Sequence, residues 1–443
     1  MADPCQFCPH RTRPVMGQGP RPARVMFVGE GPGRQEHAKG IPFCGESGWE
    51  LDRTYLPLAD LQRPEIFVTN VFRCYRGGDN PTLDQAMACS RRHMLREIRE
   101  ARPEVIVTLG AVASHTLYPD CDLMLEHGLL RPDAQLNPDL GDWRGLHVAT
   151  YHPAAGIRDS RWMIEIAEDF RRLKRILDGS YQLPGDDWPK PHYRELTDYD
   201  DAWVGANEIA VDTEVESLES MEPFCLSFSS LSGTGYVISA RRPDLLAEFS
   251  HWLRGRLVIF HNALFDLPVT AAMGIVIPEG RFVDTMAMAY HQGVPPWGQG
   301  LKTLAYRLCG MKMQDFEEVV RPGSLAALRS YFSTCWPTAL SGVGPSTQRK
   351  VSRLLSDLET GKSEDPWKRI RGWPKGQRRE VECATGGPIP FPSIIHVAHE
   401  DAMRYSARDA DAALRIYHML RRQAGAHLKR LNWASRAPSE AQE

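Results

Sequence analysis

The stretch Arg24-Val-Met-Phe-Val-Gly-Glu-Gly-Pro-Gly33 runs from an apolar, β-branched segment directly into a glycine-rich loop. A short apolar run that stops at glycine is typical of a buried strand. This alternation of strand and helix patterns predicts an α/β fold, in which a parallel sheet lies between two layers of helices. Similar strand patterns occur at 65–70, 104–110 and 146–151, with helical periodicity between them, most clearly at 82–101 and 161–177.

The length of the chain, 443 residues, predicts about two or three domains. No apolar run is long enough to span a bilayer, and no signal-peptide pattern follows the initial Met-Ala-Asp. We therefore expect a soluble, cytoplasmic protein with no membrane partner. The formal net charge of -3 neither supports nor excludes nucleic acid as a partner, because local basic patches matter more than the sum.

A change of composition to Gly, Pro, Asp and Trp marks residues 179–191, which we interpret as a linker. It separates a first domain, 1–178, from a second domain, 192–443, which is also expected to be α/β. Residues 314–399, rich in Pro, Trp and basic side chains, fit neither domain and are interpreted as an insertion. The second domain shows strand patterns at 208–214, 224–229 and 256–261, and helical patterns at 264–273, 283–290 and 401–422.

Four cysteines have the placement of metal ligands. Cys5 and Cys8 form a CxxC pair, Cys74 follows the second predicted strand, and Cys89 lies in the next helix. Four thiolates bind either a zinc ion or an iron–sulfur cluster. The other six cysteines are interpreted as ordinary small apolar side chains: Cys44, Cys121, Cys225, Cys309, Cys335 and Cys383.

Carboxylates in the second domain indicate a second site. Asp212 and Glu214 lie two residues apart on a predicted strand, so both point to one face. Burying two acids on an apolar strand is costly without a cation. Tyr405 and Asp409 share a helix face through their i, i+4 spacing, and Asp266 follows another strand pattern.

Residues 1–177 resemble the family-4 uracil-DNA glycosylases, the iron–sulfur branch of that superfamily. The resemblance runs through the CxxC pair, Val28-Gly-Glu-Gly-Pro-Gly33, Gly40-Ile-Pro-Phe43, Thr69-Asn-Val-Phe-Arg-Cys74, Cys89, Leu109-Gly110 and Ala149-Thr-Tyr-His-Pro-Ala-Ala155. It implies a glycosylase fold and a structural [4Fe–4S] cluster held by Cys5, Cys8, Cys74 and Cys89.

The same resemblance implies roles for individual residues. Phe43 would stack on a flipped base, and Asn70 would read its polar edge. His152 would hydrogen-bond the departing base, and Glu30 would steady the sugar cation or position water. Residues 154–158 would enter the minor groove as a wedge. Two further base-binding positions depart from the family pattern: Gly31 replaces Ala, Asn or Gln, and Asn80 is displaced by one residue.

The carboxylates resemble the tyrosine-containing branch of the DEDD exonucleases, closest to the proofreading domains of family-A DNA polymerases. Asp284-Thr-Met286 and Leu301-Lys-Thr-Leu-Ala305 extend the likeness over 192–313 and 400–422. It implies a ribonuclease-H-like fold and two Mg²⁺ or Mn²⁺ ions held by Asp212, Glu214, Asp266 and Asp409. Tyr405 would orient the attacking water, and Asp284 is expected to be structural.

Tryptophans alternate with cations in the insertion, at 367–371, 373–375 and 378–379. This pattern favours single-stranded DNA, bound by stacking and phosphate contact, but it fits a solvated excursion or a partner-docking loop equally well.

Together, these features predict a bifunctional repair enzyme that excises uracil or a related base and degrades DNA from 3′ ends. A DNA polymerase or another replication factor is an expected partner, and the layout resembles fusions of repair and proofreading domains encoded by phages. Two alternatives stay open: a first domain that only binds DNA and recruits the nuclease, and a nuclease that acts on RNA.

Overall fold

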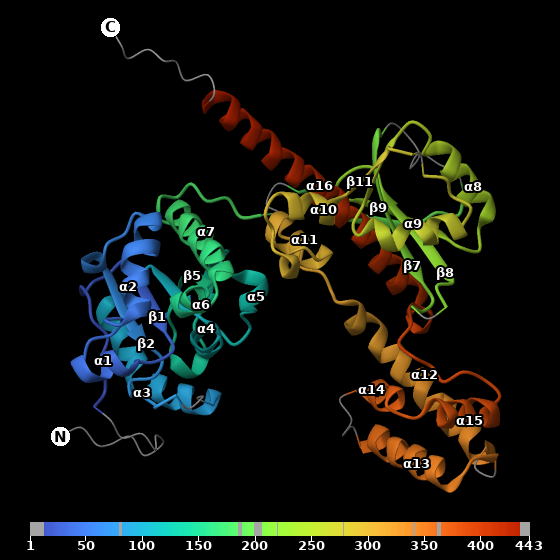
Figure 1. Cartoon of the computed structure of the whole chain (residues 1–443), viewed down its shortest axis with the longest axis horizontal. Coiled ribbons are helices and arrows are strands. Elements are labelled where there is room, and N and C mark those ends of the chain that lie inside the picture. The colour runs from blue at the N-terminus through green and yellow to red at the C-terminus, as the bar shows by residue number, and fades with distance from the viewer. Residues whose placement is uncertain are drawn as a thin grey trace. The chain divides into compact units, whose positions relative to one another are not determined.

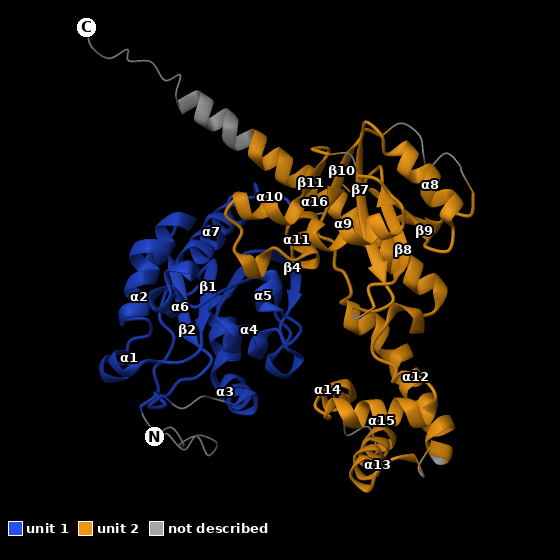
Figure 2. Ribbon diagram, turned by 45° about the vertical axis from the view of Figure 1, so that its right-hand side comes forward, with its two compact units in different colours: residues 1–183 blue, residues 184–443 orange. Residues whose placement is uncertain are grey.

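The computed structural model of the chain describes residues 13–78, 82–184, 188–198, 206–218, 220–277, 279–339, 342–360 and 365–434. The chain divides into two compact units, residues 1–183 and residues 184–443 (Figures 1 and 2). Each unit contains its own sheet, and the whole is of the α/β class, as the sequence predicts.

The sheet of the first unit has the strand order β2-β1-β3-β5-β4. The predicted strands are β1 (Val25–Gly29), β2 (Ile66–Asn70), β3 (Val105–Leu109) and β5 (Arg144–Thr150), and they pair in parallel. The edge strand β4 (Leu130–Gln135) is antiparallel to β5 and was not predicted. Its sequence is polar and only Ala134 is buried, so it lacks the apolar run that reveals the others.

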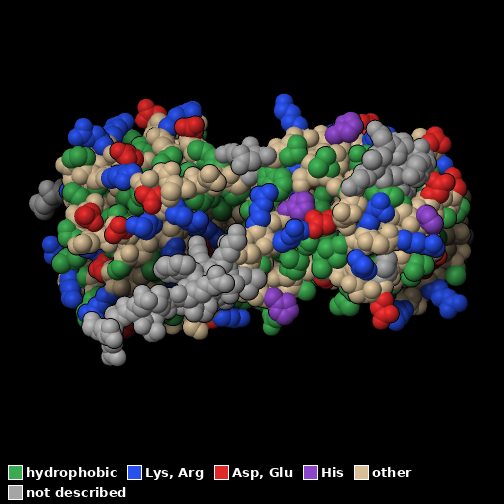
Figure 3. Space-filling model, turned by 90° about the horizontal axis from the view of Figure 1, so that it is seen from above, with side chains coloured by type: hydrophobic (Ala, Val, Ile, Leu, Met, Phe, Trp, Pro, Cys, Tyr) green, Lys and Arg blue, Asp and Glu red, His purple; other side chains and the backbone are tan. Residues whose placement is uncertain are grey.

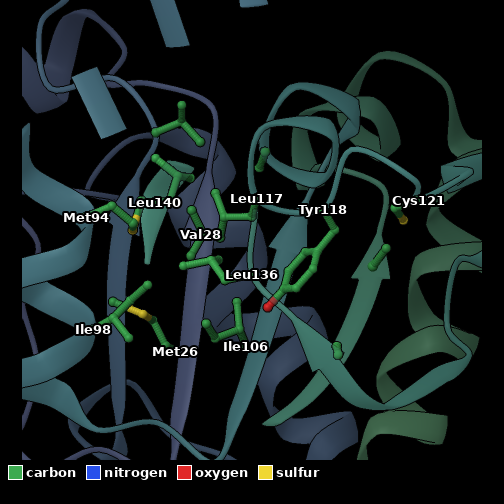
Figure 4. Close-up of a cluster of buried hydrophobic side chains, with 14 of the residues drawn as sticks. Met26, Val28, Met94, Ile98, Ile106, Leu117, Tyr118, Cys121, Leu136 and Leu140 are labelled. Atoms are coloured by element: carbon green, nitrogen blue, oxygen red, sulfur yellow. The ribbon is translucent and has the colours of Figure 1, made fainter. Parts of the chain in front are cut away.

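Alternate residues of the strands pack into two cores, one on each face of the sheet. Val25 and Phe27 of β1 pack with α7 (Ser160–Leu177), whereas Met26 and Val28 pack with α3 (Leu83–Ala101). Figure 4 shows Met26 and Val28 of β1 in the same cluster as Met94 and Ile98 of α3. The sheet is thereby covered on both sides, as in other parallel sheets.

The carboxyl ends of the parallel strands lie at one edge of this sheet, where Gly29 pairs with Asn70. Loops and short helices gather around that edge, which is where α/β proteins bind ligands. The short elements of the first unit are α1 (Arg34–Lys39), α2 (Glu46–Glu50), η1 (Leu51–Tyr55), η2 (Leu56–Ala59), η3 (Arg63–Glu65), α4 (Ala111–Leu117), α5 (Leu123–Glu126), η4 (Pro138–Leu140) and α6 (Pro153–Arg158).

The second unit contains a mixed sheet with the strand order β11-β10-β7-β8-β9-β6. Its central strand β7 (Glu208–Val215) is antiparallel to β8 (Pro223–Ser229) and parallel to β10 (Leu257–Phe260). The remaining strands are β6 (His192–Glu195), β9 (Thr234–Ser239) and β11 (Phe282–Asp284).

The long helix α16 (His399–Ala434) crosses one face of this sheet, and α8 (Pro243–Trp252) and α9 (Ala263–Ala272) cover the other. Ala413 and Leu414 of α16 pack on Ala210 of β7, whereas Ile209 and Val211 face the α8 side. The alternation of β7 therefore directs Asp212 and Glu214 to the α16 face. Three shorter elements complete this part: α10 (Thr285–His291), η6 (Pro296–Gly298) and α11 (Leu301–Cys309).

The insertion is a helical subdomain with a core of its own. It comprises α12 (Phe316–Ala339), α13 (Pro345–Thr360), α14 (Pro366–Arg371), α15 (Lys375–Thr385) and η8 (Ile394–His396). Trp367 and Trp373 are only 3% and 5% exposed, because they pack in this core. The predicted stacking of these tryptophans on bases is therefore wrong, since their rings are needed to hold the helices together.

On the face of the molecule that Figure 3 shows, basic and acidic side chains are interspersed. In the part of the chain that the structure describes, no helix is both long and apolar enough to cross a membrane.

Candidate active sites

The glycine-rich loop after β1 is fixed against the segment after β2. The N–H groups of Val71 and Phe72 donate to the carbonyls of Gly29 and Glu30 at 2.9 and 2.8 Å. A Cβ atom on Gly29 would lie 2.5 Å from Oδ1 of Asn70 and 2.6 Å from the ring of Phe43. Position 29 must therefore be glycine, and its missing side chain lets the Phe43 ring and the Asn70 amide converge.

Phe43 is held in an unfavourable backbone conformation, with φ of 53°. Its N–H donates to Oε1 of Glu36 at 2.5 Å, and its carbonyl accepts from Arg63 at 3.0 Å. A non-glycine residue with positive φ persists only where its surroundings impose it, often at a functional site. Its ring lies stacked on the imidazole of His152, with centroids 5.9 Å apart and planes at 24°.

His152 is the N-terminal cap of α6, because its Nδ1 accepts a hydrogen bond from the N–H of Ala154 at 3.1 Å. The neutral ring must therefore carry its proton on Nε2. Burial, followed by the positive charge of Arg158, lowers the pKa of His152 to about 4. At neutral pH the imidazole is an uncharged hydrogen-bond donor.

Asn70 and Glu30 complete the first site from two neighbouring strand ends. Asn70 is 1% exposed, and its Nδ2 is buried with no hydrogen-bond partner among the described residues. Such an orphaned donor is costly unless a ligand satisfies it. Partial burial raises the pKa of Glu30, while the charges of Arg158 and Arg76 act against that rise. Gly31 packs on Phe72, whose Cβ would lie 3.2 Å from a Cβ at position 31.

Two of the four predicted cluster ligands can be located. Cys74 lies after β2 and Cys89 on α3, and both are half-buried. Two soft sulfur donors shielded from water suit an iron–sulfur cluster or zinc. Cys5 and Cys8, and the base-binding candidate Asn80, lie outside the described residues. Of the cysteines predicted to be ordinary, Cys121, Cys225 and Cys309 are buried in the cores.

The second site lies between β7 and α16. Asp212, Glu214 and Asp409 each place a carboxylate oxygen within 4.8 Å of the others. Burial and mutual repulsion raise the pKa values of Asp212 and Glu214 well above the ordinary range. Oδ1 of Asp409 is buried without a hydrogen-bond partner among the described residues. This donor set fits hard divalent cations, which relieve the repulsion between buried carboxylates.

Asp266, in the first turn of α9, lies beside this group but is not among the carboxylates whose oxygens lie within 4.8 Å of one another. Its Oδ1 accepts from the N–H and the hydroxyl of Thr213 at 3.0 and 2.7 Å, which ties it to β7 between the two strand acids. Burial raises the pKa of Asp266 to about 7, and its charge in turn raises the pKa of Asp212. Burial also raises the pKa of Asp409, to about 6.

Asp284 has the structural role that the sequence predicts. Its carboxylate accepts hydrogen bonds from the N–H groups of Asn262, Ala263 and Met286, at distances between 2.8 and 3.0 Å. It thereby fixes the turn that begins α9, on which Asp266 lies.

Lys302 is a residue of this site that the sequence interpretation missed. Its Nζ donates to the hydroxyl of Tyr405 at 2.9 Å and lies 4.8 Å from the centre of that ring. Its charge also opposes the raised pKa values of Asp212, Glu214 and Asp409. The available signal is its place in Leu301-Lys-Thr-Leu-Ala305, one of the segments that carry the resemblance to the exonucleases.

A cavity of about 310 Å³ opens beside Tyr405 and Asp409. Its wall includes Glu318 and Val319 of α12, together with Arg404 and Arg408 of α16. This volume is at the lower end of the range for small-molecule sites, and its wall is of mixed charge, because Asp401 and Asp409 line it as well.

Comparisons with known proteins agree with the geometry of both units. Residues 16–171 match the family model of the uracil DNA glycosylase superfamily, and residues 193–330 match that of a 3′–5′ exonuclease. The type-4 uracil-DNA glycosylase of Saccharolobus solfataricus is 33% identical over 175 residues, which are 39% of this chain and 80% of that protein. The type-4 enzyme of Archaeoglobus fulgidus is 31% identical over 39% of this chain and 86% of its own length.

The chain thus belongs to the uracil-DNA glycosylase superfamily, with homologues among the type-4 enzymes, and carries a 3′–5′ exonuclease domain after it. Both domains are of hydrolase families, so the protein is an enzyme. Among solved structures, this chain is similar to NrnC of Brucella melitensis bound to pGG. The match spans 59% of this chain and the whole of the NrnC chain, with 15% sequence identity and a TM-score of 0.28.

Proposed function

We propose that this enzyme excises uracil from DNA and hydrolyses DNA from 3′ ends, and that both activities serve DNA repair. The observation that supports excision is the convergence of Phe43, the orphaned Asn70 amide and neutral His152 at the mouth of a glycine-rich loop. The observation that supports hydrolysis is the grouping of two half-buried carboxylates and one buried carboxylate within 4.8 Å of one another.

In the excision step, the uracil ring leaves the DNA stack and lies on Phe43. The Asn70 side chain hydrogen-bonds the polar edge of the base, which satisfies its otherwise orphaned Nδ2. As the glycosidic bond breaks, negative charge develops on the base oxygen, and Nε2–H of His152 donates to it. A neutral donor is suited to this task. Because the pKa of His152 is lowered to about 4, its imidazole stays uncharged at physiological pH and keeps the proton on Nε2.

In this proposal, Glu30 acts on the sugar side of the breaking bond. Its carboxylate stabilises the developing positive charge or orients the water that attacks it. Arg158 and Arg76 lower the pKa of Glu30 against the effect of burial, and they thereby favour the ionised form that this role requires.

In the hydrolytic step, Asp212, Glu214, Asp266 and Asp409 hold two Mg²⁺ or Mn²⁺ ions, which activate water and stabilise the leaving 3′ oxygen when bound. The hydroxyl of Tyr405 orients the attacking water. Lys302 fixes that hydroxyl through its 2.9 Å hydrogen bond. Arg404 and Arg408, on the wall of the adjacent cavity, suit the phosphate of the terminal nucleotide.

We further propose that Cys5, Cys8, Cys74 and Cys89 hold a [4Fe–4S] cluster. Half-buried Cys74 and Cys89 support it, as do the type-4 relatives. Anaerobically purified protein should be brown and contain about four iron atoms per chain. A colourless protein with one equivalent of zinc would overturn this assignment.

The nuclease proposal is tested with end-labelled single strands of DNA and RNA of the same sequence, in Mg²⁺. We expect mononucleotides released from the 3′ end of DNA. Degradation of RNA alone would contradict the proposed repair function and assign the nuclease to RNA.

A further inference from the structure

The insertion carries a run of cations that neither active site uses. Between Pro366 and Arg379 there is no acidic residue. The run covers α14, the turn at 372–374 and the beginning of α15, two consecutive helices joined by a short turn, which we call the hairpin. Its basic members are Lys368, Arg369, Arg371, Lys375, Arg378 and Arg379.

Most of this charge is uncompensated at the surface. Arg369 is half-buried and pairs with Asp357 of α13. Lys368, Arg371, Lys375 and Arg379 are exposed, and no carboxylate of the described residues lies within ion-pair distance of them. We call these four side chains the hairpin cations.

The hairpin cations lie on two helix faces joined by a short turn. Lys368 and Arg371 are three residues apart on α14, and Lys375 and Arg379 are four residues apart on α15. At these spacings, side chains project from the same side of a helix. The hairpin therefore presents two pairs of cations close to one turn, a pattern that suits successive phosphates of one backbone.

The apolar residues of the insertion leave no platform for bases or for an apolar protein partner. Trp367 and Trp373 are buried, and the indole N–H of Trp367 donates to the carbonyl of Pro390 at 3.0 Å. Among the described residues of the insertion, Ile395 of η8 is the only large hydrophobic side chain that is exposed, and it does not lie on α14 or α15. Proteins bind unpaired bases by stacking them on exposed aromatic rings, and the described residues of this surface include none. Recognition by this surface must therefore depend on charge.

Contacts across the subdomain hold the hairpin rigid. Glu380 of α15 accepts hydrogen bonds from the N–H of Gly344 and the hydroxyl of Thr347, at the start of α13. In the opposite direction, Lys350 of α13 donates to Gln377 of α15 at 2.6 Å. A preorganised charged surface binds with less loss of conformational entropy than flexible side chains on a loop.

Both ends of the insertion are anchored beside the nuclease site. At the start of α12, Phe316 packs edge-on against Tyr405, with ring centroids 6.2 Å apart. Farther along α12, the hydroxyl of Ser324 pairs with Nδ1 of His396 at 3.0 Å, and the nearby Ser393 hydroxyl donates to the carbonyl of Glu216, just after β7. The helix that carries the subdomain thus begins at the wall of the nuclease cavity.

We propose that the hairpin cations bind the phosphate backbone of DNA whose 3′ end enters the nuclease site, without reading its bases. This inference rests on the proposed nuclease function for the identity of the substrate. In this proposal the contact is purely electrostatic, and no base stacks on Trp367 or Trp373. DNA binding should therefore depend strongly on salt concentration and show no sequence preference.

The test compares the triple variant Lys368→Gln, Lys375→Gln, Arg379→Gln with a control of equal charge change, Arg241→Gln, Arg254→Gln, Arg281→Gln. The control arginines are also exposed but lie near α8 and β11. Both sets are made in the Asp212→Asn background, and affinity for a labelled duplex with a 3′ overhang is measured by anisotropy over a range of salt. Melting temperatures of all proteins check that they fold.

We expect the hairpin variant to bind the duplex at least about tenfold more weakly at low salt, with the slope of log Kd against log salt reduced by about 3. The control should bind like the parent. Equal affinities and slopes for all three proteins would overturn the proposal, as would a loss confined to a double-stranded RNA probe, which would assign the surface to RNA.

A second readout separates this inference from the proposed nuclease function. With Asp212 restored, hydrolysis of the small substrate thymidine 5′-monophosphate p-nitrophenyl ester should be equal in the hairpin variant and the wild type. Lost ester hydrolysis in the variant would show damage to the active site and overturn the assignment. If the wild type hydrolyses neither ester nor DNA, the nuclease function fails, whereas hairpin-dependent DNA binding would still support the surface.

Discussion

Lys302 contacts the hydroxyl that the proposed nuclease mechanism uses to orient water. Replacing it by glutamine should lower the exonuclease kcat about a hundredfold, because Tyr405 loses its fixed position and the three clustered carboxylates lose a compensating charge. KM should change much less. The exposed Lys312 provides the control, since Lys312→Gln should leave kcat unchanged. An unaltered kcat for Lys302→Gln would show that Tyr405 needs no such support.

His147 provides a test of electrostatics in the first unit. It is fully buried, hydrogen-bonded to Thr108 at 2.9 Å and stacked on Tyr118, and burial holds its pKa well below the ordinary value of 6.5. In the unfolded chain the ring takes up a proton below about pH 6.5. Its contribution to stability is therefore present above that pH and lost as pH falls.

The wild type should accordingly lose about 2 kcal/mol relative to His147→Gln between pH 8 and pH 5. The measurement is the melting temperature of both proteins at the two pH values. Parallel shifts of the two proteins would mean that His147 titrates normally in the fold.

Single residues also show where sequence reasoning succeeded and failed. The acids of β7 could be predicted because strand alternation alone places Asp212 and Glu214 on one face. The burial of Trp367 and Trp373 could not be predicted. An aromatic residue next to basic residues gives the same sequence pattern whether its ring faces solvent or packs in a core. That distinction depends on tertiary contacts within the insertion.

At the scale of elements, α6 carries both a proposed catalytic residue and the predicted wedge. His152 caps its start, and Ile157, which is 47% exposed, lies near its end within the predicted wedge. Ile157→Ala should slow uracil release from duplex DNA about tenfold or more, because the gap left by the flipped base is less well filled, and should barely affect single strands. Ile164→Ala, at another exposed isoleucine of this unit, is the matched control. Equal losses on both substrates would exclude a wedge role.

Helix α16 is attached to the sheet through the buried carboxylate of Asp411, which also forms an ion pair within the helix. Asp411 and Arg415 are paired at 2.8 Å, and the same carboxylate accepts from Tyr193 and from the N–H of Gly233. Asp411→Ala should destabilise the second unit by about 3 kcal/mol or more, since a charge and two donors are left buried.

Thermal unfolding should show this loss together with weakened nuclease activity, because Asp409 and Tyr405 lie on the same helix. Breaking the exposed pair of Glu400 and Arg404 on α16 by Glu400→Ala should change stability by less than about 1 kcal/mol. Comparable effects of the two substitutions would show that Asp411 does not anchor the helix.

Elements with strong periodicity could be predicted from the sequence almost to their ends, as α7 and β7 show. The weaker ones could not. Strand β4 is polar and β6 has only four residues, so neither has a strong strand pattern of its own. Each forms because it pairs with a neighbouring strand, β4 with β5 and β6 with β9. Such dependence on partners is not visible in a local pattern.

At the scale of the whole molecule, the proposed base-releasing unit needs no added metal, whereas the proposed nuclease unit requires it. The two reactions therefore separate under chelation, and the Asp212→Asn substitution should separate them in the same way. This separation also distinguishes excision from a first unit that only recruits the nuclease to DNA.

The most direct measurement is release of uracil from a single-stranded oligonucleotide by the wild-type protein in excess EDTA, followed by alkaline cleavage at abasic sites. We predict one cleavage product at the uracil position, formed equally by Asp212→Asn, with no shortening from the 3′ end. An oligonucleotide that stays intact after alkali would contradict the proposed excision and leave the first unit as a DNA-binding domain.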